Sequence, residues 1–128
     1  MKDFLNHTFA IVAYKESPFL EKTVQSILKQ EIKSRVFIST STPNEWIRKI
    51  ANDYQLPLYV NTGKAGIAGD WEFALSSAST PYVTLAHQDD IYLPNYSGVI
   101  EAIFTKYPDT LIAFSDYREI DDTDSIRK

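Results

Sequence analysis

Residues 82–94 are Tyr-Val-Thr-Leu-Ala-His-Gln-Asp-Asp-Ile-Tyr-Leu-Pro, an apolar run that ends in the adjacent carboxylates of Asp89 and Asp90. A short apolar run bounded by Pro81 and by a polar cluster predicts a buried strand. In an open α/β sheet, ligands bind in the crevice beyond the carboxyl ends of the strands. We therefore expect Asp89 and Asp90 to lie at the edge of a binding cleft.

The rest of the chain alternates apolar strands with amphipathic helices. Further strands are predicted at residues 9–13, 35–40, 58–60 and 111–114. Between them, apolar residues at helical spacing predict helices with buried stripes over 20–28, 47–54, 71–78 and 96–104. Such alternation predicts an α/β fold, in which helices cover both faces of a mostly parallel, Rossmann-like sheet through right-handed crossovers.

Three details of the helices are predicted from local patterns. Ser17, followed by Pro18, is expected to cap the first helix. The sequence from Thr42 to Glu45 has the form of a capping box, which predicts that Thr42 begins the second helix. The third helix is expected to carry Trp71, Ala74, Leu75 and Ala78 on one face.

Composition favours one globular domain, which we place at residues 1–115, followed by a polar tail at 116–128. The chain has 128 residues, of which 44% are hydrophobic, enough for one core. A net charge of -4 argues against binding to nucleic acid, which requires a concentrated basic surface. There is no cysteine, no signal peptide and no run of the roughly 18 apolar residues that span a membrane. We expect a cytoplasmic location, with membrane association of a longer protein left open.

Three of the four glycines, Gly63, Gly66 and Gly69, fall in one stretch after the third predicted strand. Such density predicts close backbone approach or positive φ before the next helix. The spacing is neither the GxGxxG of dinucleotide-binding proteins nor a P-loop. A two-component receiver domain is disfavoured because Tyr14 to Ser17 supplies no acidic pair after the first strand.

Adjacent carboxylates such as Asp89 and Asp90 are suited to Mg²⁺ or Mn²⁺, which often share a diphosphate with one or two protein carboxylates. Such an ion would stabilise the charge that grows on a departing diphosphate. The pair alone is equally compatible with aspartates that place negative charge near the amino end of a helix.

Two segments together resemble the amino-terminal half of a family 2 glycosyltransferase with the GT-A fold. The opening segment FAIVAYKESPFLEKTVQSILKQ, at residues 9–30, is similar to the family's first strand, turn and LxxxLxSLLxQ helix. The segment YVTLAHQDDIYLPNY, at residues 82–96, is similar to its Asp-x-Asp-Asp motif followed by an apolar pair and proline. The resemblance extends over essentially the whole chain and implies binding of a nucleotide-diphosphate sugar.

The resemblance assigns a metal-binding role to Asp89, with Mn²⁺ or Mg²⁺ as the cofactor. Asp90 is expected to orient water, metal or donor sugar. His87 replaces the motif's first aspartate, which usually faces the ribose or sugar. The histidine either keeps a contact with the ligand or is structural.

On the nucleotide side, the resemblance places Ala13, Tyr14 and Glu16 near the base and ribose. Ser39 stands where an aspartate commonly contacts the base, so the identity of the base is left open. Simple packing remains an alternative for Tyr14.

The resemblance also places the backbone around Gly66 beside the diphosphate or donor sugar. The family's Arg-Asn pair is replaced here by Asp70 and Trp71. Asp70 is expected either to accept a hydrogen bond from a sugar hydroxyl or to serve the amino end of the helix. Lys64 is the alternative cation for phosphate, although a solvated lysine is the simpler interpretation.

We expect the chain to be the donor-binding part of a glycosyltransferase of the kind used in bacterial-type polysaccharide or glycoprotein glycosylation. The acceptor, whether glycan, glycoprotein or lipid, is unknown, and no residue matches the catalytic base. The second half of such enzymes is expected to lie beyond this chain. A non-catalytic nucleotide-binding or assembly module of a larger protein is the alternative, and the oligomeric state, homo-oligomer included, is open.

Overall fold

The computed structural model describes residues 3–113 and residue 120. The chain divides into two compact units, Met1–Gly98 and Val99–Lys128, and the first contains the whole sheet. The elements in chain order are β1 (Asp3–Ala13), α1 (Leu20–Leu28), β2 (Lys33–Thr40), α2 (Glu45–Asp53), β3 (Leu58–Val60), α3 (Ile67–Ser77), β4 (Tyr82–His87) and α4 (Tyr96–Lys106). In the part of the chain that the structure describes, no helix is long and apolar enough to cross a membrane.

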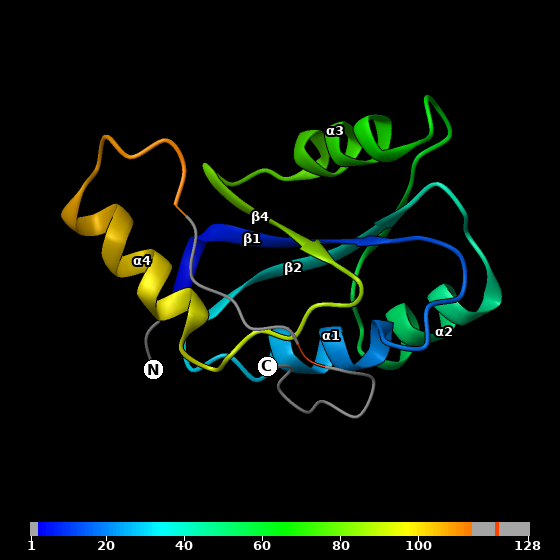
Figure 1. The fold of residues 1–128 in the computed structure, drawn as a ribbon, viewed down its shortest axis with the longest axis horizontal. Helices are drawn as coiled ribbons and strands as arrows, with labels where there is room; N and C mark the ends of the chain where they lie inside the picture. Colours follow the sequence, from blue (N-terminus) through cyan, green and yellow to red (C-terminus); the bar gives the residue numbers. More distant parts are fainter. Residues whose placement is uncertain (1–2, 114–119, 121–128) are drawn as a thin grey trace. The chain divides into compact units, whose positions relative to one another are not determined.

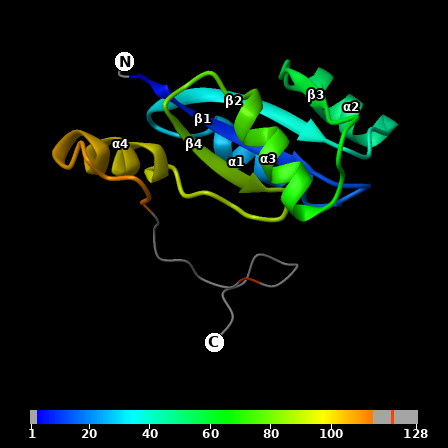
Figure 2. The same cartoon turned by 90° about the horizontal axis from the view of Figure 1, so that it is seen from above.

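The four strands form one parallel sheet in the order β3-β2-β1-β4 (Figures 1 and 2; β3 is labelled in Figure 2). In this register Val12 of β1 lies between Ser39 of β2 and His87 of β4. The chain moves outward from β1 through β2 to β3 and then returns to place β4 on the other side of β1. The strand order therefore reverses between β1 and β4, and ligands bind at such switch points in open α/β sheets. The predicted Rossmann-like fold is confirmed.

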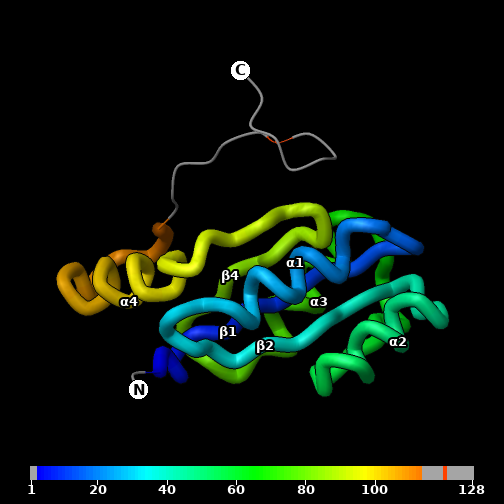
Figure 3. The backbone as a smooth tube through the Cα atoms, turned by 90° about the horizontal axis from the view of Figure 1, so that it is seen from below, coloured from blue at the N-terminus to red at the C-terminus, as the bar shows by residue number. Residues whose placement is uncertain are grey.

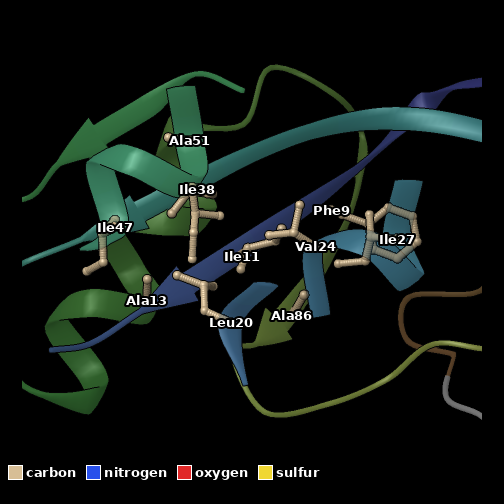
Figure 4. Packing of buried hydrophobic residues seen from close by; sticks show 11 residues of the cluster. Phe9, Ile11, Ala13, Leu20, Val24, Ile27, Ile38, Ile47, Ala51 and Ala86 are labelled. Atoms are coloured by element: carbon tan, nitrogen blue, oxygen red, sulfur yellow. The ribbon is translucent and has the colours of Figure 1, made fainter. Parts of the chain in front are cut away.

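Helices α1 and α2 cover one face of the sheet and α3 covers the other, as crossovers of one hand require (Figures 1 and 3). The larger cluster of buried residues joins the inward faces of α1 and α2 to the sheet (Figure 4). It comprises Phe9, Ile11, Ala13, Leu20, Val24, Ile27, Ile38, Ile47, Ile50, Ala51 and Ala86. The stripes predicted for the first two helices therefore face this core.

Helix α3 lies along the sheet (Figure 2), and only part of its predicted inward face packs there. Ala74 is buried with Ala10 and Phe37, and Ala78 packs against them. Trp71 and Leu75, however, are 40% and 48% exposed. The side of α3 that faces the protein is therefore turned away from Trp71 and Leu75 and toward Asp70. The carboxylate of Asp70 is buried and is held there by hydrogen bonds.

Both predicted helix caps are wrong in detail. Helix α1 begins at Leu20 after Phe19, and the Ser17 hydroxyl instead accepts the Phe19 N–H at 3.2 Å. Helix α2 is capped by Asn44, whose Oδ1 accepts the Ile47 N–H at 2.8 Å. Asparagine caps helices as well as threonine does. Thr42 is engaged elsewhere.

The predicted last strand does not form in its described part. Residues 111–113 are not in a strand, and Phe114 lies outside the described residues. Leu111 and Ile112 are 94% and 78% exposed. A short apolar run forms a strand only where a neighbouring edge pairs with it, and that cannot be deduced from composition. The predicted domain boundary after residue 115 stays a prediction, and the tail, except residue 120, lies outside the described residues.

His7 is a buried polar residue in the middle of the sheet. Its exposed fraction is 1%, and its ring stacks on Phe4 with centroids 5.1 Å apart. Nδ1 is 2.8 Å from the Ser34 hydroxyl on β2, and Nε2 is 2.7 Å from the Thr84 hydroxyl on β4. Burial lowers the pKa of His7 to about 4, so the side chain is neutral at pH 7.

Candidate functional site

The carboxyl ends of β1 and β4 are joined by one side chain, that of Gln88. Its Oε1 accepts the Tyr14 N–H at 2.9 Å, and its Nε2 donates to the Tyr14 carbonyl at 3.1 Å. The two backbone polar atoms of Tyr14 are thus engaged within the protein. Its side chain is 48% exposed, so the aromatic ring is the part of Tyr14 that can meet a ligand.

Asp89 and Asp90 follow directly and are both exposed. The Asp90 N–H donates to the His87 carbonyl at 3.2 Å, which closes the turn. Although Asp90 as a whole is exposed, partial desolvation of its carboxyl group raises its pKa, and the adjacent Asp89 charge raises it further. His87 acts in the opposite direction. The two carboxylates therefore repel each other at the edge of the sheet.

The segment after the two aspartates is anchored to α1. The Tyr92 N–H donates to the Ser26 hydroxyl at 3.1 Å. Gln30, which is 1% exposed, donates from Nε2 to the Leu93 carbonyl at 2.7 Å and accepts the Ser97 N–H at 2.8 Å. The turn is consequently held on both sides, by Gln88 before it and by Ser26 of α1 and Gln30 after it.

The turn after β1 is also held in place. Lys15 has φ +55°, an uncommon backbone conformation for a residue other than glycine. Its N–H donates to the Thr42 hydroxyl at 2.6 Å, and its carbonyl accepts from Asn44 Nδ2 at 2.9 Å. Its ammonium lies 5.1 Å from the centroid of the Tyr14 ring. These contacts fix the backbone next to Tyr14.

The other residues predicted for the nucleotide side differ in accessibility. Glu16 is exposed, whereas Ala13 and Ser39 are each 1% exposed within the sheet. The Ser39 hydroxyl is buried and has no hydrogen-bond partner among the described residues. A base could reach Ser39 only if the covering side chains moved.

The glycine-rich stretch has both predicted properties. Gly66, which precedes α3, has φ +96°. At Gly69 a Cβ atom would collide with the Lys64 carbonyl, so the backbone approaches closely there. The expected positive φ is confirmed at Gly66, and the expected close backbone approach is confirmed at Gly69.

Asp70 connects α3 with the ends of two strands. It is 8% exposed; Oδ1 accepts from Asn61 Nδ2 at 3.2 Å and Oδ2 accepts from the Ser41 hydroxyl at 3.1 Å. Asn61 Nδ2 also donates to the Lys64 carbonyl at 2.9 Å. Each carboxylate oxygen of Asp70 therefore has a protein partner, and these bonds fix the first turn of α3.

His87 contacts an aromatic residue of α3. Its ring centroid is 5.3 Å from that of Trp71, with the planes inclined at 47°. Since His87 is the last residue of β4, this contact places Trp71 beside the Asp89–Asp90 turn.

The protein ligands considered for a metal ion are the carboxylates of Asp89 and Asp90. In the described ranges, no group of three or more histidine, aspartate or glutamate side chains is positioned to hold a metal ion. The two carboxylates nevertheless suit Mg²⁺ or Mn²⁺ if a diphosphate completes the coordination, which is the usual arrangement for Mg²⁺. The residues present fit such a shared site.

The structure brings Tyr14, His87, Asp89 and Asp90 to one region through contacts that the sequence did not identify. Gln88 and Trp71 were missed. Gln30 and Ser26 belong to the helix pattern that resembles family 2 glycosyltransferases, and their hydrogen bonds to the loop after the aspartates give that pattern a structural reason.

Comparisons with known proteins bear on the family and on the fold of the chain. The family model described as Glycosyl transferase family 2 matches residues 8–128. The crystal structure of residues 1–349 of TarS from S. aureus superposes with a TM-score of 0.71 at 16% sequence identity, covering 84% of this chain and 33% of that chain. At this identity the likeness shows the fold, and the chain spans about a third of that structure's length. No curated protein matches the sequence.

Proposed function

Since the chain belongs to glycosyl transferase family 2, we propose that it binds a nucleotide-diphosphate sugar through a divalent metal and presents the sugar to an acceptor hydroxyl. Membership of the family implies a sugar-nucleotide donor and an acceptor. The metal, the residues that bind the donor, and the nature of the acceptor as glycan, glycoprotein or lipid belong to the proposal.

The observation that carries the proposal is the double hydrogen bond between Gln88 and Tyr14. It joins the strand ends at the switch point of the sheet and keeps the exposed Tyr14 ring next to the Asp89–Asp90 turn. A base stacked on the ring and a diphosphate at the carboxylates would then occupy one continuous edge. Stacking tolerates every base, because each has an aromatic face.

Asp89 is the proposed metal ligand, and Asp90 supports it by orienting water, metal or donor sugar. A bound Mn²⁺ or Mg²⁺ ion would neutralise charge on the leaving diphosphate. Two adjacent exposed carboxylates support this role, because a cation relieves the repulsion between them.

The remaining residues also have proposed roles, and they differ in how accessible their side chains are to a ligand. His87 faces the ribose or the sugar, and the backbone at Gly66 flanks the diphosphate. Glu16 is accessible at the nucleotide end. Ala13 and Ser39 would contact the base only after local movement, because both are buried. Asp70 would contact a sugar hydroxyl only by giving up a bond to Ser41 or Asn61.

Isothermal titration calorimetry tests the proposal directly. The chain is titrated with UDP-, GDP- and dTDP-sugars, each with and without Mn²⁺. We expect one nucleotide series to bind, and to bind more tightly with Mn²⁺. Absence of binding by the folded chain in every series would refute the proposed donor site.

A non-catalytic nucleotide-binding or assembly module is the second candidate. It is favoured by the histidine at position 87, where the family motif has an aspartate, and by the engaged carboxylate of Asp70. The same titration separates the two functions. Nucleotide binding that is insensitive to Mn²⁺ would favour the second candidate over metal-dependent transfer.

A further inference from the structure

Trp71 is an aromatic residue that the fold leaves partly uncovered. Its exposed fraction is 40%, and it lies on α3 between Ile67 and Leu75, which are 73% and 48% exposed. These residues are spaced by four positions and share one outward side of the helix. The Trp71 ring also contacts the ring of His87.

The position of Trp71 is fixed from two directions. The adjacent Asp70 is tied to Ser41 and Asn61, which fixes the first turn of α3. The His87 ring meets the indole with a centroid distance of 5.3 Å. His87 is the end of β4, and the proposed metal ligand Asp89 comes two residues later. The indole is therefore held beside the proposed diphosphate site.

We propose that the exposed face of the Trp71 indole, supported by His87, is the stacking platform for the sugar ring of the nucleotide-diphosphate donor. The inference rests on the proposed function and names which part of the donor meets α3. The sugar is bonded directly to the diphosphate that would share the metal of Asp89, so it must lie close to the turn.

The chemistry of an indole suits this occupant. An aromatic ring carries partial negative charge on its face, and the C–H groups on one side of a pyranose are weakly positive. Small-molecule sites typically combine such apolar surfaces with a few polar groups that fix orientation. Here the polar groups are the carboxylates of Asp89 and Asp90 and the imidazole of His87. A diphosphate offers no such C–H face, and the base is assigned to the Tyr14 ring by the proposed function.

Tryptophan fluorescence can test the platform because the chain has two tryptophans. Trp46 lies on α2, packs partly buried against the core and donates from Nε1 to the Ser17 carbonyl at 2.8 Å. A Trp46→Phe variant therefore leaves Trp71 as the only indole. With Mg²⁺ present, we expect its emission to change on addition of UDP-, GDP- or dTDP-glucose, whichever nucleotide series binds. The corresponding UDP, GDP or dTDP alone should change it far less.

Calorimetry on Trp71→Ala supplies the affinity. We expect weaker binding of the sugar nucleotide by roughly three- to tenfold, the range for one aromatic contact, and nearly unchanged binding of the bare nucleotide. Trp71→Phe should retain part of the difference. Leu75→Ala, one turn further along the same exposed stripe, is the matched control and should alter neither affinity.

The outcomes are separable. If the wild type binds no nucleotide, the proposed function fails and the platform fails with it. If the wild type binds but Trp71→Ala weakens nucleotide and sugar nucleotide equally, or neither, the platform is wrong while the proposed function stands. An equal emission response to both ligands would also overturn it.

Discussion

The carboxamide of Gln88 pairs with the N–H and the carbonyl of Tyr14, two residues that are far apart in the sequence and adjacent at the carboxyl edge of the sheet. The side chain continues the pairing of β4 with β1 beyond its last backbone partners, Val12 and His87. Gln88 therefore supports both the Tyr14 ring, proposed to stack on the base, and the Asp89–Asp90 turn, proposed to bind the metal.

Replacing Gln88 should lower both the stability of the fold and its affinity for nucleotides. Gln88→Ala removes two hydrogen bonds, which typically contribute about 1 kcal/mol each, and we expect unfolding free energy to fall by about 1–2 kcal/mol. Nucleotide affinity should fall with it, because the Tyr14 ring loses its fixed position. Urea unfolding and calorimetry measure the two effects. Asn52→Ala, at an exposed position of α2, is the control and should change neither.

Asp89→Ala should abolish the enhancement of nucleotide binding by Mn²⁺ with little effect on stability. Asp89 is exposed, and surface substitutions usually change the unfolding free energy by no more than about 0.5 kcal/mol. Titrations with and without Mn²⁺ measure the enhancement. Asp3→Ala, at the opposite end of the sheet, serves as the control. Equal enhancement in wild type and Asp89→Ala would show that Asp89 is structural.

His7 should make the fold sensitive to acid. Its pKa is about 4 in the folded chain against 6.5 for an ordinary histidine, so below pH 6.5 the unfolded chain binds the proton more readily. The contribution is complete above pH 6.5 and is lost as the pH falls toward 4, about 3 kcal/mol in all. Urea unfolding from pH 7.5 to 5 should show a shallower pH dependence in His7→Gln. An NMR titration of wild-type His7 with a midpoint near 6.5 would contradict the assignment.

The glycine-rich stretch offers a matched pair of substitutions. At Gly69 an added methyl group collides with the Lys64 backbone carbonyl, which cannot move without disturbing the hydrogen bond from Asn61. At Gly63 the nearest atom, Asn61 Oδ1, is at an ordinary 3.5 Å. We expect Gly69→Ala to cost about 1–3 kcal/mol and Gly63→Ala far less. Thermal unfolding measures both, and equal melting temperatures would refute the close approach.

The strands and helices of the first unit were predictable because their signals are local. Apolar runs such as residues 9–13 and helical spacing such as that of Leu20, Val24 and Ile27 directly reflect which side chains are buried. The helix caps were harder, since Thr42 and Asn44 both suit a cap and only tertiary contacts chose between them.

The candidate site was predictable only in part. The two aspartates were visible as a motif, whereas Gln88 was an ordinary polar residue between them and β4. Its function depends on a partner at position 14, and Gln30 likewise depends on partners at positions 93 and 97. Trp71 was expected to face the core, because the burial of Asp70, which rotates the helix, depends on Ser41 and Asn61.

The sheet order β3-β2-β1-β4 also determines when, during folding, the edge that carries Asp89 can form. Strands β1, β2 and β3 follow one another in the chain and pair as neighbours, so their contacts close short loops. The pairing of β4 with β1 closes a much longer loop, at a greater cost in chain entropy. During synthesis from the amino terminus, the β1–β2–β3 layer can therefore form first. The edge that holds Asp89 is completed only when the segment through Ser97 has emerged and bound Gln30, just after α1.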